Sequence, residues 1–379
     1  MKRIACEPRA NWREVVEARG LKWHTGAEPY WSESAYYQFT TDEVDAIERA
    51  TNELHERCLE AVQHVIDEKR YAELKIPEHA IPLIERSWND EPPSVYGRFD
   101  LAYDGSAPPV MLEYNADTPT SLLEASVIQW DWLEQCHSGA DQFNSLHERL
   151  VALWRDMIPY LPASGALGPL VHFSSMDDIE DGMTAAYLAE TAVQAGVRAQ
   201  LVGVSDIGWD PRAREFVDVD DQKIDTIFKL YPWEWLIHEP FAQHLAKAAT
   251  TFIEPAWKMV LSNKGILAIL WDLFPGHPNL LPAYLDEPNG MFEYVKKPLL
   301  SREGANVTVH TMKEHLESTG DYGAEGYVFQ QLAPIPDFES KRPVLGSWII
   351  GQEAGGMGVR EADGWVTGNT SRFVPHLFR

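Results

Sequence analysis

The stretch GRFDLAYDGSAPPVMLEYNADTPTS, residues 97–121, is predicted to form a β-hairpin. Its two apolar flanks surround a central Asp-Gly pair, which is typical of a tight turn. Residues two apart in a strand point to the same face. Arg98 and Asp100 therefore share one face of the first strand. Glu113 and Asn115 share one face of the second strand for the same reason. If the ends pair without a bulge, all four side chains lie on one face.

Two interpretations of this polar face are open from the pattern alone. An exposed sheet face with a cross-strand pair between arginine and a carboxylate is common and contributes little stability. The alternative is a site of oxygen ligands for a hard cation such as Mg²⁺, with Arg98 placed for an anionic reactant.

The composition limits the classes of partner. A chain of 379 residues can form one large multi-lobed unit or two domains. It has 58 acidic and 32 basic residues, for a formal net charge of −26. Nucleic acids and anionic membranes bind basic faces, so neither is expected as a partner. The negative net charge suits a cationic substrate or one that binds together with a metal ion. Solubility alone is a commoner reason for such a net charge.

The cysteines and the chain start predict a cytoplasmic protein. Cys6, Cys58 and Cys136 are far apart and form neither a disulfide framework nor a zinc pattern. The first residues carry charges throughout and lack the apolar core of a signal peptide. The longest apolar runs, such as GILAILW at 265–271, are too short to span a bilayer.

The first half of the chain is predicted to be mainly helical around the hairpin. Residues 1–40 lack a clear pattern and are expected to be irregular. An amphipathic helix is predicted over 40–74, with Thr41 as its cap. Further helices are expected over 120–135 and 144–158.

The middle of the chain alternates strands and helices. A buried-type strand at 168–175 is followed by a helical run at 177–195 and a strand at 199–204. Another strand at 223–232 leads into a helix over 233–249. This order predicts a parallel α/β layer.

The last third has the pattern of antiparallel strands separated by turns rich in glycine and proline. The predicted strands lie within 292–299, 306–311, 326–333, 343–352 and 364–369. The whole chain is therefore expected to be a mixed α/β and α+β fold.

Three later segments have features that suit phosphate binding. Lys264 stands just before a predicted helix, and Lys297 lies on a predicted strand. The run GGMGVR at 355–360 combines glycines with Arg360. Glycine loops let backbone N–H groups approach phosphate oxygens. Each segment is weak alone, because the Walker and dinucleotide motifs are absent. No motif for a nucleophilic serine, a reactive cysteine or zinc is present either.

In their order, several segments resemble the synthetase domain of the glutathionylspermidine synthetase family of ATP-grasp ligases. The resemblance runs from about residue 10 to the end, through GRFD, EYNAD, EPAWKMVLSNKGILAILWDLFPGHPNLLPAY, VKKPLLSREGANV, FQQL and GGMGVR. It implies an ATP-grasp fold with the nucleotide between two β-containing lobes. We expect a single unit, 1–379, with approximate lobes at 1–165, 166–255 and 256–379.

The resemblance also implies roles for individual residues. Asp100, Glu113 and Asn115 would hold Mg²⁺ ions that bridge the phosphates of ATP. Arg98 would bind the transferred phosphoryl group and stabilise an acyl phosphate as a catalytic residue. The other residues implied to bind ATP are Lys264, Lys297, Glu303, Gly304, Gln330, Gln331, Leu332, Ala333 and Arg360. Thr118 would face a thiol-peptide substrate, and Asp178, with its neighbour Asp177, would meet the amine.

Some positions depart from the family pattern and leave the substrates open. The chain begins almost directly with the synthetase part, so no amidase activity is expected. Leu230 or Tyr231 stands where the family has a substrate-binding hydroxyl residue, and Val344 where a glutamine would contact nucleotide.

Two functional hypotheses follow. The first is an ATP- and Mg²⁺-dependent ligase that joins a small-molecule or peptide carboxylate to an amine through an acyl phosphate. The acidic charge favours a cationic amine, such as a polyamine. The alternative is a non-catalytic ATP-binding protein that senses a peptide or polyamine.

Overall fold

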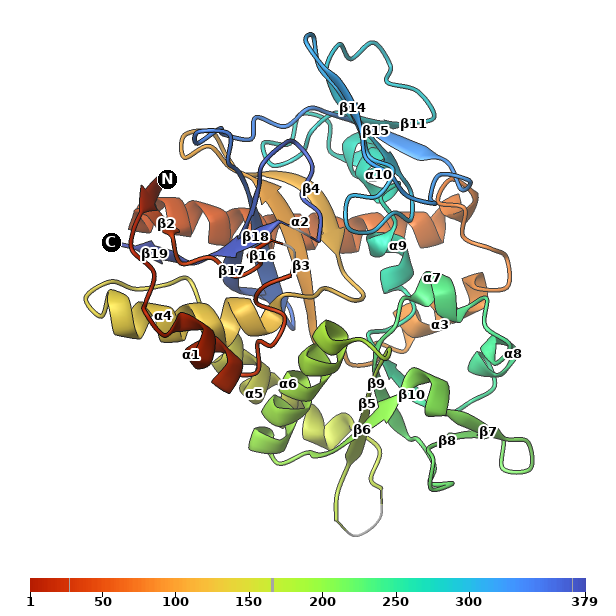
Figure 1. Ribbon diagram of the computed structural model, residues 1–379. Helices are drawn as coiled ribbons and strands as arrows, with labels where there is room; N and C mark the ends of the chain where they lie inside the picture. The colour runs from red at the N-terminus through yellow and green to blue at the C-terminus, as the bar shows by residue number, and fades with distance from the viewer. Residues whose placement is uncertain (27, 165–166, 370) are drawn as a thin grey trace.

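The predicted hairpin forms in the computed structural model, which describes residues 1–26, 28–164, 167–369 and 371–379 (Figure 1). Its strands are β3 (Tyr96–Ala102) and β4 (Val110–Asn115). In this antiparallel pair Arg98 lies opposite Asn115, and Asp100 lies opposite Glu113. The register shifts only between Asp100 and Leu101, on the turn side of both pairs. All four polar side chains therefore share one face, as predicted.

The hairpin belongs to a five-stranded antiparallel sheet, here called the hairpin sheet. It continues through β16 (Arg342–Ile350), β17 (Glu353–Ala362) and β18 (Arg372–Val374), in the order β18-β17-β16-β3-β4. The glycine run at 355–360 thus lies inside β17, and its interpretation as a phosphate loop was wrong. Gly346 of β16 lies opposite Asp100, and a Cβ there would sit 2.9 Å from Cδ of Arg98. The missing side chain leaves room for the arginine.

A long helix covers the opposite face of the hairpin sheet. Helix α2 (Thr41–Asp67) passes behind the sheet in Figure 1. Its capping box joins Thr40 and Glu43, so the cap lies one residue before the predicted Thr41. The hairpin residues that alternate with the polar set are buried here in the main core: Phe99, Leu101, Met111 and Tyr114. Burial of this apolar face fixes which side of the hairpin carries the polar set.

The first forty residues were expected to be irregular but contain three regular elements. These are β1 (Lys2–Ala5), α1 (Trp12–Ala18) and β2 (Ala35–Phe39). Strand β2 pairs with β1 on one side and with β19 (His376–Phe378) on the other. The two ends of the chain therefore lie close together (Figure 1). One partner of β2, strand β19, is distant in sequence, and local sequence patterns do not reveal such a pairing.

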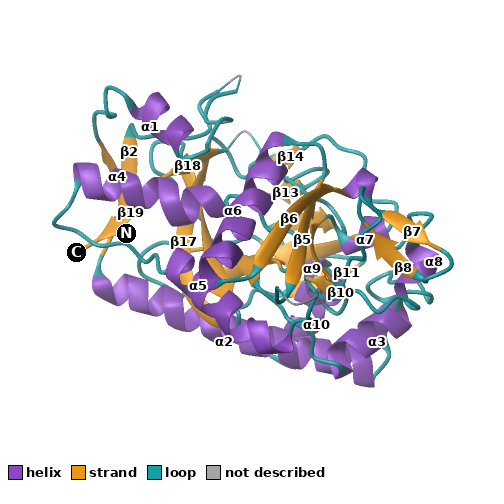
Figure 2. Cartoon of the chain, turned by 90° about the horizontal axis from the view of Figure 1, so that it is seen from below, coloured by secondary structure: helices purple, strands orange, loops and turns teal. Residues whose placement is uncertain are grey.

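The predicted parallel layer is confirmed. Strands β5 (Leu170–Ser175), β6 (Arg198–Gly203), β9 (Thr226–Leu230) and β10 (Thr251–Ile253) form a parallel sheet in the order β10-β9-β5-β6. Helix α6 (Ile179–Ala195) connects β5 to β6 and ends at Gly196, which has a φ of +99°. Helix α6 packs against β5 and β6, and α5 lies beside α6 and contacts β16 and β17 of the hairpin sheet (Figure 2).

Two segments around this sheet differ from the prediction. The helix expected over 233–249 is split into α7 (Trp233–Leu236) and α8 (Ala242–Leu245). Pro240 stands between them, where proline disfavours a continuous helix. A small hairpin of β7 (Gly208–Asp210) and β8 (Glu215–Val217) precedes β9.

A second antiparallel sheet, here called the small sheet, comes from the last third of the chain. It contains β11 (Ala283–Leu285), β12 (Tyr294–Pro298), β13 (Thr308–His310), β14 (His315–Glu317) and β15 (Tyr327–Gln331). Their order is β11-β15-β12-β13-β14. The chain is thus a mixed α/β structure, as predicted.

The described part of segment 364–369, predicted as a strand, is a loop. The remaining helical elements are Arg70–Ala72, α3 (Ile81–Asn89), a π-helical segment at Glu124–Ile128, α4 (Gln129–Cys136), α5 (Leu146–Met157), Ile158–Tyr160, Val204–Asp206, α9 (Lys258–Ser262) and α10 (Ile266–Leu273).

Among the described residues, no helix has both the length and the apolar character needed to cross a membrane.

Candidate active site

The polar face of the hairpin opens into a cavity of about 350 Å³ between the hairpin sheet and the start of α6. Loops around 302–304 and 367–369 close its other side. The predicted site residues that line it are Arg98, Asp100, Glu113, Asn115, Thr118, Asp178, Glu303, Gly304 and Arg360. The fold therefore gathers residues from four distant parts of the chain at one place.

Arg98 and Asp100 form the centre of this cavity. Nε of Arg98 donates to Oδ1 of Asp100 over 2.8 Å, and Nη2 donates to Oδ2 over 3.3 Å. Nη1 donates to the carbonyl oxygen of Thr120 over 2.6 Å. Burial raises the pKa of Asp100, Arg98 opposes this effect, and the nearby charge of Glu113 adds to it. A bound cation would therefore stabilise both carboxylates.

Glu113 faces two lysines that come from outside the hairpin. Nζ of Lys264 lies 3.2 Å from Oε2 of Glu113 and donates to the carbonyl of Ser301 over 2.6 Å. Burial alone would raise the pKa of Glu113, but the charges of Lys264 and Lys297 outweigh it and lower the pKa to about 2. This carboxylate is ionised at neutral pH.

Lys297 joins the small sheet to the hairpin. Its buried Nζ donates to the carbonyl of Leu112 over 2.8 Å and to Oε1 of Gln330 over 2.7 Å. Gln330 in turn donates from Nε2 to the carbonyl of Met111 over 2.8 Å. Burial lowers the pKa of Lys297 to about 8, and the charge of Lys264 acts in the same direction, whereas Glu113 opposes it. An incoming anion would favour the charged form of this lysine.

Lys264, Lys297 and Gln330 do not line the cavity, and neither do the other residues predicted for the adenine side. Gln331 is exposed and Leu332 is half-buried at the end of β15. Ala333 is buried in a small apolar cluster with Ala102 and Val110. These three residues lie along the edge where the small sheet meets the hairpin.

Glu303 and Gly304, which were predicted to cover the phosphates, lie against the loop that precedes β18. Glu303 and Gly304 both adopt positive φ angles, +56° and +71°. A Cβ at Gly304 would lie 2.6 Å from the Val366 side chain, so this position suits only glycine. Glu303 accepts a hydrogen bond from the side chain of Asn369. Arg360 donates to the carbonyl of Gly368 over 2.9 Å.

Arg302 is a site residue that the sequence analysis missed. Its Nη1 donates to Oγ1 of Thr118 over 2.9 Å, and Nη2 lies 3.0 Å from Oε1 of Glu234. Arg302 stands immediately before Glu303 and Gly304, and this position in the sequence could have indicated that it belongs to the site. Arg302 lines the cavity together with Arg98 and Arg360, so the cavity holds three arginines.

The acidic wall of the cavity is formed by the start of α6. Asp178 is the N-cap of this helix and accepts from the backbone N–H groups of Glu180, over 2.9 Å, and Asp181, over 3.3 Å. Glu180 and Asp181, which the sequence analysis missed, line the cavity beside Asp178. Burial, then the charges of Asp178 and Glu180, raise the pKa of Asp181 to about 6. This wall suits a cationic group.

A buried ion pair fixes the chain that follows β4. Nζ of Lys229, at the end of β9, donates to Oδ1 of Asp117 over 2.6 Å. Oδ2 of Asp117 accepts from the backbone N–H of Trp233 over 2.8 Å. Both side chains are buried, and burial raises the pKa of Asp117 and lowers that of Lys229. Each side chain therefore needs the opposite charge of its partner to remain ionised in this buried position.

Replacing Lys229 by methionine is expected to lower the free energy of unfolding by about 3–5 kcal/mol, because it leaves the carboxylate of Asp117 buried without its partner. Urea unfolding followed by tryptophan fluorescence measures this change. Lys223→Met is the matched control, since Lys223 pairs with Glu215 and Asp225 at the surface; it should change stability by less than about 0.5 kcal/mol. Equal stabilities of the two variants would contradict the assigned role.

The donor set at the hairpin fits Mg²⁺. Among the described residues, no group of three His, Cys, Asp or Glu side chains is placed to hold a metal ion. Mg²⁺ commonly binds through one or two carboxylates, with phosphate oxygens and water completing its shell. Asp100 and Glu113 supply two carboxylates, and Asn115, which donates from its amide nitrogen to Glu113 over 3.2 Å, keeps its oxygen for a ligand.

Comparison with known proteins identifies the family. The family model described as glutathionylspermidine synthase preATP-grasp matches residues 3–379, so the chain belongs to this family. The resemblance inferred from the sequence motifs is confirmed. Membership places the chain among the ATP-dependent ligases that join an acid to an amine.

Three curated relatives are similar over most of this chain. A Haemophilus influenzae protein, provisionally named an acid–amine ligase, is 46% identical, with 92% of this chain and 91% of that protein covered. The trypanothione synthetase of Crithidia fasciculata is 30% identical, with 85% and 53% covered. The bifunctional glutathionylspermidine synthetase/amidase of Escherichia coli is 26% identical, with 90% and 58% covered. The chain thus spans little more than half of the last two proteins.

Proposed function

We propose that this protein is an ATP- and Mg²⁺-dependent ligase that joins a carboxylate to an amine through an acyl phosphate. The observation that carries this proposal is the polar face of the hairpin, where Arg98, Asp100, Glu113 and Asn115 adjoin Lys264. The names of the relatives support the same class of reaction.

The first step is activation of the acid. A carboxylate and an amine do not condense in water, so a carboxylate oxygen first attacks the γ-phosphorus of ATP and releases ADP. Bound Mg²⁺ would neutralise the phosphate charge at Asp100, Glu113 and Asn115. Arg98 and Arg302, which line the same cavity, are placed to stabilise charge on the transferred phosphoryl group.

The second step is attack by the amine. Its nitrogen, after losing a proton, adds to the acyl carbon, and inorganic phosphate leaves as the amide forms. Asp178, Glu180 and Asp181 would attract the ammonium form of the amine to the cavity. Thr118, held by Arg302, is proposed to contact the acid substrate.

The nucleotide is proposed to lie between the hairpin sheet and the small sheet, as in an ATP-grasp fold. Lys264 and Lys297 lie at the junction of these sheets and would bind phosphate oxygens. Segment 330–333, at the edge of the small sheet, would line the adenine pocket. Glu303 and Gly304 would cover the phosphates.

A screen for ADP release tests the proposal. Purified protein is incubated with ATP, Mg²⁺ and pairs drawn from a panel of acids and amines, and the products are identified by mass spectrometry. Glutathione with spermidine is the first pair. An amide product whose formation matches ADP release supports the ligase. ATP binding without ADP release from any pair would instead favour the non-catalytic sensor.

The amine affinity should depend on pH through the acidic wall. Asp181, with a pKa of about 6, loses its charge as the pH falls through 6 and then no longer attracts an ammonium group. The KM for the amine is therefore expected to rise about tenfold between pH 7 and pH 5. Asp181→Asn should give a high KM that changes less with pH. A pH-independent KM in the native protein would contradict this role.

A further inference from the structure

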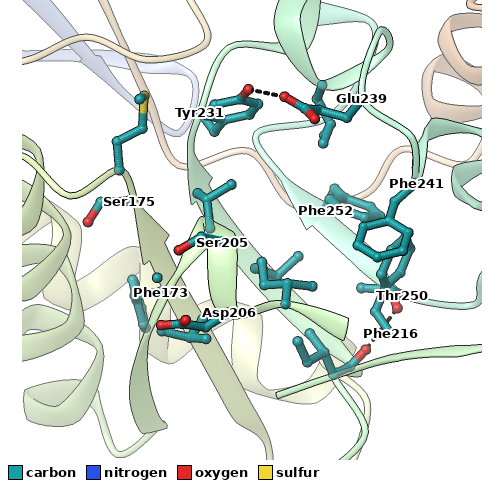
Figure 3. Close-up of a pocket in the computed structure, with 18 of the residues that line it drawn as sticks. Phe173, Ser175, Ser205, Asp206, Phe216, Tyr231, Glu239, Phe241, Thr250 and Phe252 are labelled. Atoms are coloured by element: carbon teal, nitrogen blue, oxygen red, sulfur yellow. Dashed lines mark hydrogen bonds between the residues drawn. The ribbon is translucent and has the colours of Figure 1, made fainter. Parts of the chain in front are cut away.

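A second cavity, of about 1110 Å³, extends along the parallel strands and reaches the carboxyl ends of β5, β6 and β9 (Figure 3). Ser175 ends β5, Gly203 ends β6 and Tyr231 follows β9; all three line this cavity. In open parallel sheets, ligands bind at the carboxyl ends of two adjacent strands from which the chain continues to opposite sides of the sheet. Here β5 continues to β6 on one side, and β9 continues to β10 on the other. The position of the cavity is therefore that of a ligand site.

The walls of this cavity are mainly apolar. Figure 3 shows Phe216, Phe241 and Phe252 along one side. Three of the large apolar side chains that are exposed on this protein also line it: Leu201 (57% exposed), Met176 (44%) and Phe241 (43%). Single exposed apolar residues are ordinary, but their grouping around one cavity marks a binding surface.

The charged lining of this cavity is acidic. Among the described residues, its charged side chains are Asp177, Asp206 and Glu239, with no lysine, arginine or histidine. Glu239 accepts a hydrogen bond from the hydroxyl of Tyr231 over 2.6 Å, which Figure 3 also shows. Such a lining disfavours an acid or a nucleotide and suits an apolar molecule that is cationic.

The large cavity adjoins the candidate active site. Met176 lines both cavities, Asp177 lines the large one and Asp178 lines the active-site cavity. Tyr231 lines the large cavity, whereas Leu230 and Pro232, its neighbours in the sequence, line the active-site cavity. The segments 180–182 and 235–236 also lie between the cavities, since Asp181 and Trp235 line the active-site cavity and Gly182 and Leu236 line the large one. One ligand can therefore place a charged end at the acidic wall and an apolar end in the large cavity.

We propose that the large cavity binds the apolar body of the amine co-substrate, and that this amine carries a ring-sized or branched hydrophobic group without a free carboxylate. This inference rests on the proposed ligase function. A linear polyamine carries charges along its whole length and has no apolar group to match the apolar lining of this cavity. The amine nitrogen would point toward Asp178 and Glu180.

Calorimetry on the full chain tests the binding part, with 4-phenylbutylamine, 4-phenylbutyrate and spermidine as probes. The arylalkylamine is expected to bind at least about tenfold more tightly than the other two. The double variant Leu201→Ser/Phe241→Ser should weaken that binding by about tenfold or more, because two apolar contacts are lost. Both side chains are exposed, so the variant should fold. Phe292→Ser, at an 82% exposed position outside the cavity, is the matched control and should change nothing.

Turnover separates this inference from the ligase proposal. With the acid found by the ADP-release screen, 4-phenylbutylamine should support turnover, and the double variant should lower kcat/KM for this amine but not for methylamine. Turnover with 4-phenylbutylamine that the double variant leaves unchanged, or turnover that is confined to amines without an apolar group, would overturn the inference and leave the ligase standing. Cavity binding without ADP release from any acid–amine pair would instead overturn the ligase proposal, and with it the assignment of the ligand as a co-substrate.

Discussion

Replacing Asp100 by asparagine is expected to lower kcat/KM for ADP release by about a thousandfold. The substitution keeps the size of the side chain but removes one of two carboxylates that face each other on the hairpin. It also removes the negative charge that pairs with the guanidinium of Arg98, whose Nε lies 2.8 Å from Oδ1 of Asp100. A coupled assay for ADP, with the acid–amine pair from the screen, measures the loss.

The matched control for this prediction is Asp45→Asn. Asp45 is an exposed carboxylate on α2, far along the chain from the cavity residues, and its loss should leave kcat/KM unchanged. Thermal unfolding of both variants shows whether the fold is kept. Near-native turnover in a folded Asp100→Asn variant would remove Asp100 from the site, and with it the proposed Mg²⁺ ligation.

Replacing Lys297 by methionine is expected to weaken ATP binding by about a hundredfold, since one hydrogen-bonded charge contributes roughly 1.5–3 kcal/mol. Methionine preserves the apolar stem but cannot donate to a phosphate oxygen. It also removes the contacts with Leu112 and Gln330. Calorimetry with the non-hydrolysed analogue AMP-PNP and Mg²⁺ measures the affinity.

The neighbouring residue on β12 supplies the control. Nζ of Lys296 lies 3.7 Å from the ring centroid of Tyr327, and alternation along the strand turns it to the other face. Lys296→Met should therefore change the affinity by less than about threefold. Equal losses in the two variants would indicate a general effect of positive charge rather than a phosphate contact at Lys297.

The hairpin face was predictable because alternation in a strand is a local property. Arg98 and Asp100 are two residues apart, as are Glu113 and Asn115, and the apolar residues between them fix which face is buried. The bulge after Asp100 falls outside the paired polar residues, so it did not change the outcome. The parallel layer was predictable for a similar reason, since strand–helix–strand order decides it.

The glycines of β17 show where local patterns fail. Glycine is common in loops, but it is also required where another group approaches a strand closely. A Cβ at Gly358 would lie 2.5 Å from the ring of Phe373, and one at Gly356 would lie 2.9 Å from Leu146. These neighbours become visible only after the sheet and α5 have assembled. The composition of the segment therefore favoured a loop where the structure has a strand.

Arg302, Glu180 and Asp181 were missed for a different reason. Arg302 lies within the quoted segment VKKPLLSREGANV, and Glu180 and Asp181 belong to the acidic start of α6, but all three reach the cavity only through the packing of separate elements. The start of α6 is acidic, which is ordinary at the start of any helix. Only the arrangement of α6 beside the hairpin distinguishes a cavity wall from a solvated helix end.

The attachment of Lys297 and Gln330 to the backbone of β4 bears on how this scaffold can be altered by evolution or by design. Exchange of the small sheet between homologues must bring a matching lysine and glutamine, or the graft loses the hydrogen bonds that anchor it to β4. The lining of the apolar cavity comes from another stretch, 173–252. Under the proposed assignments, changes in that stretch would alter amine preference and leave the contacts of Lys297 and Gln330 unchanged.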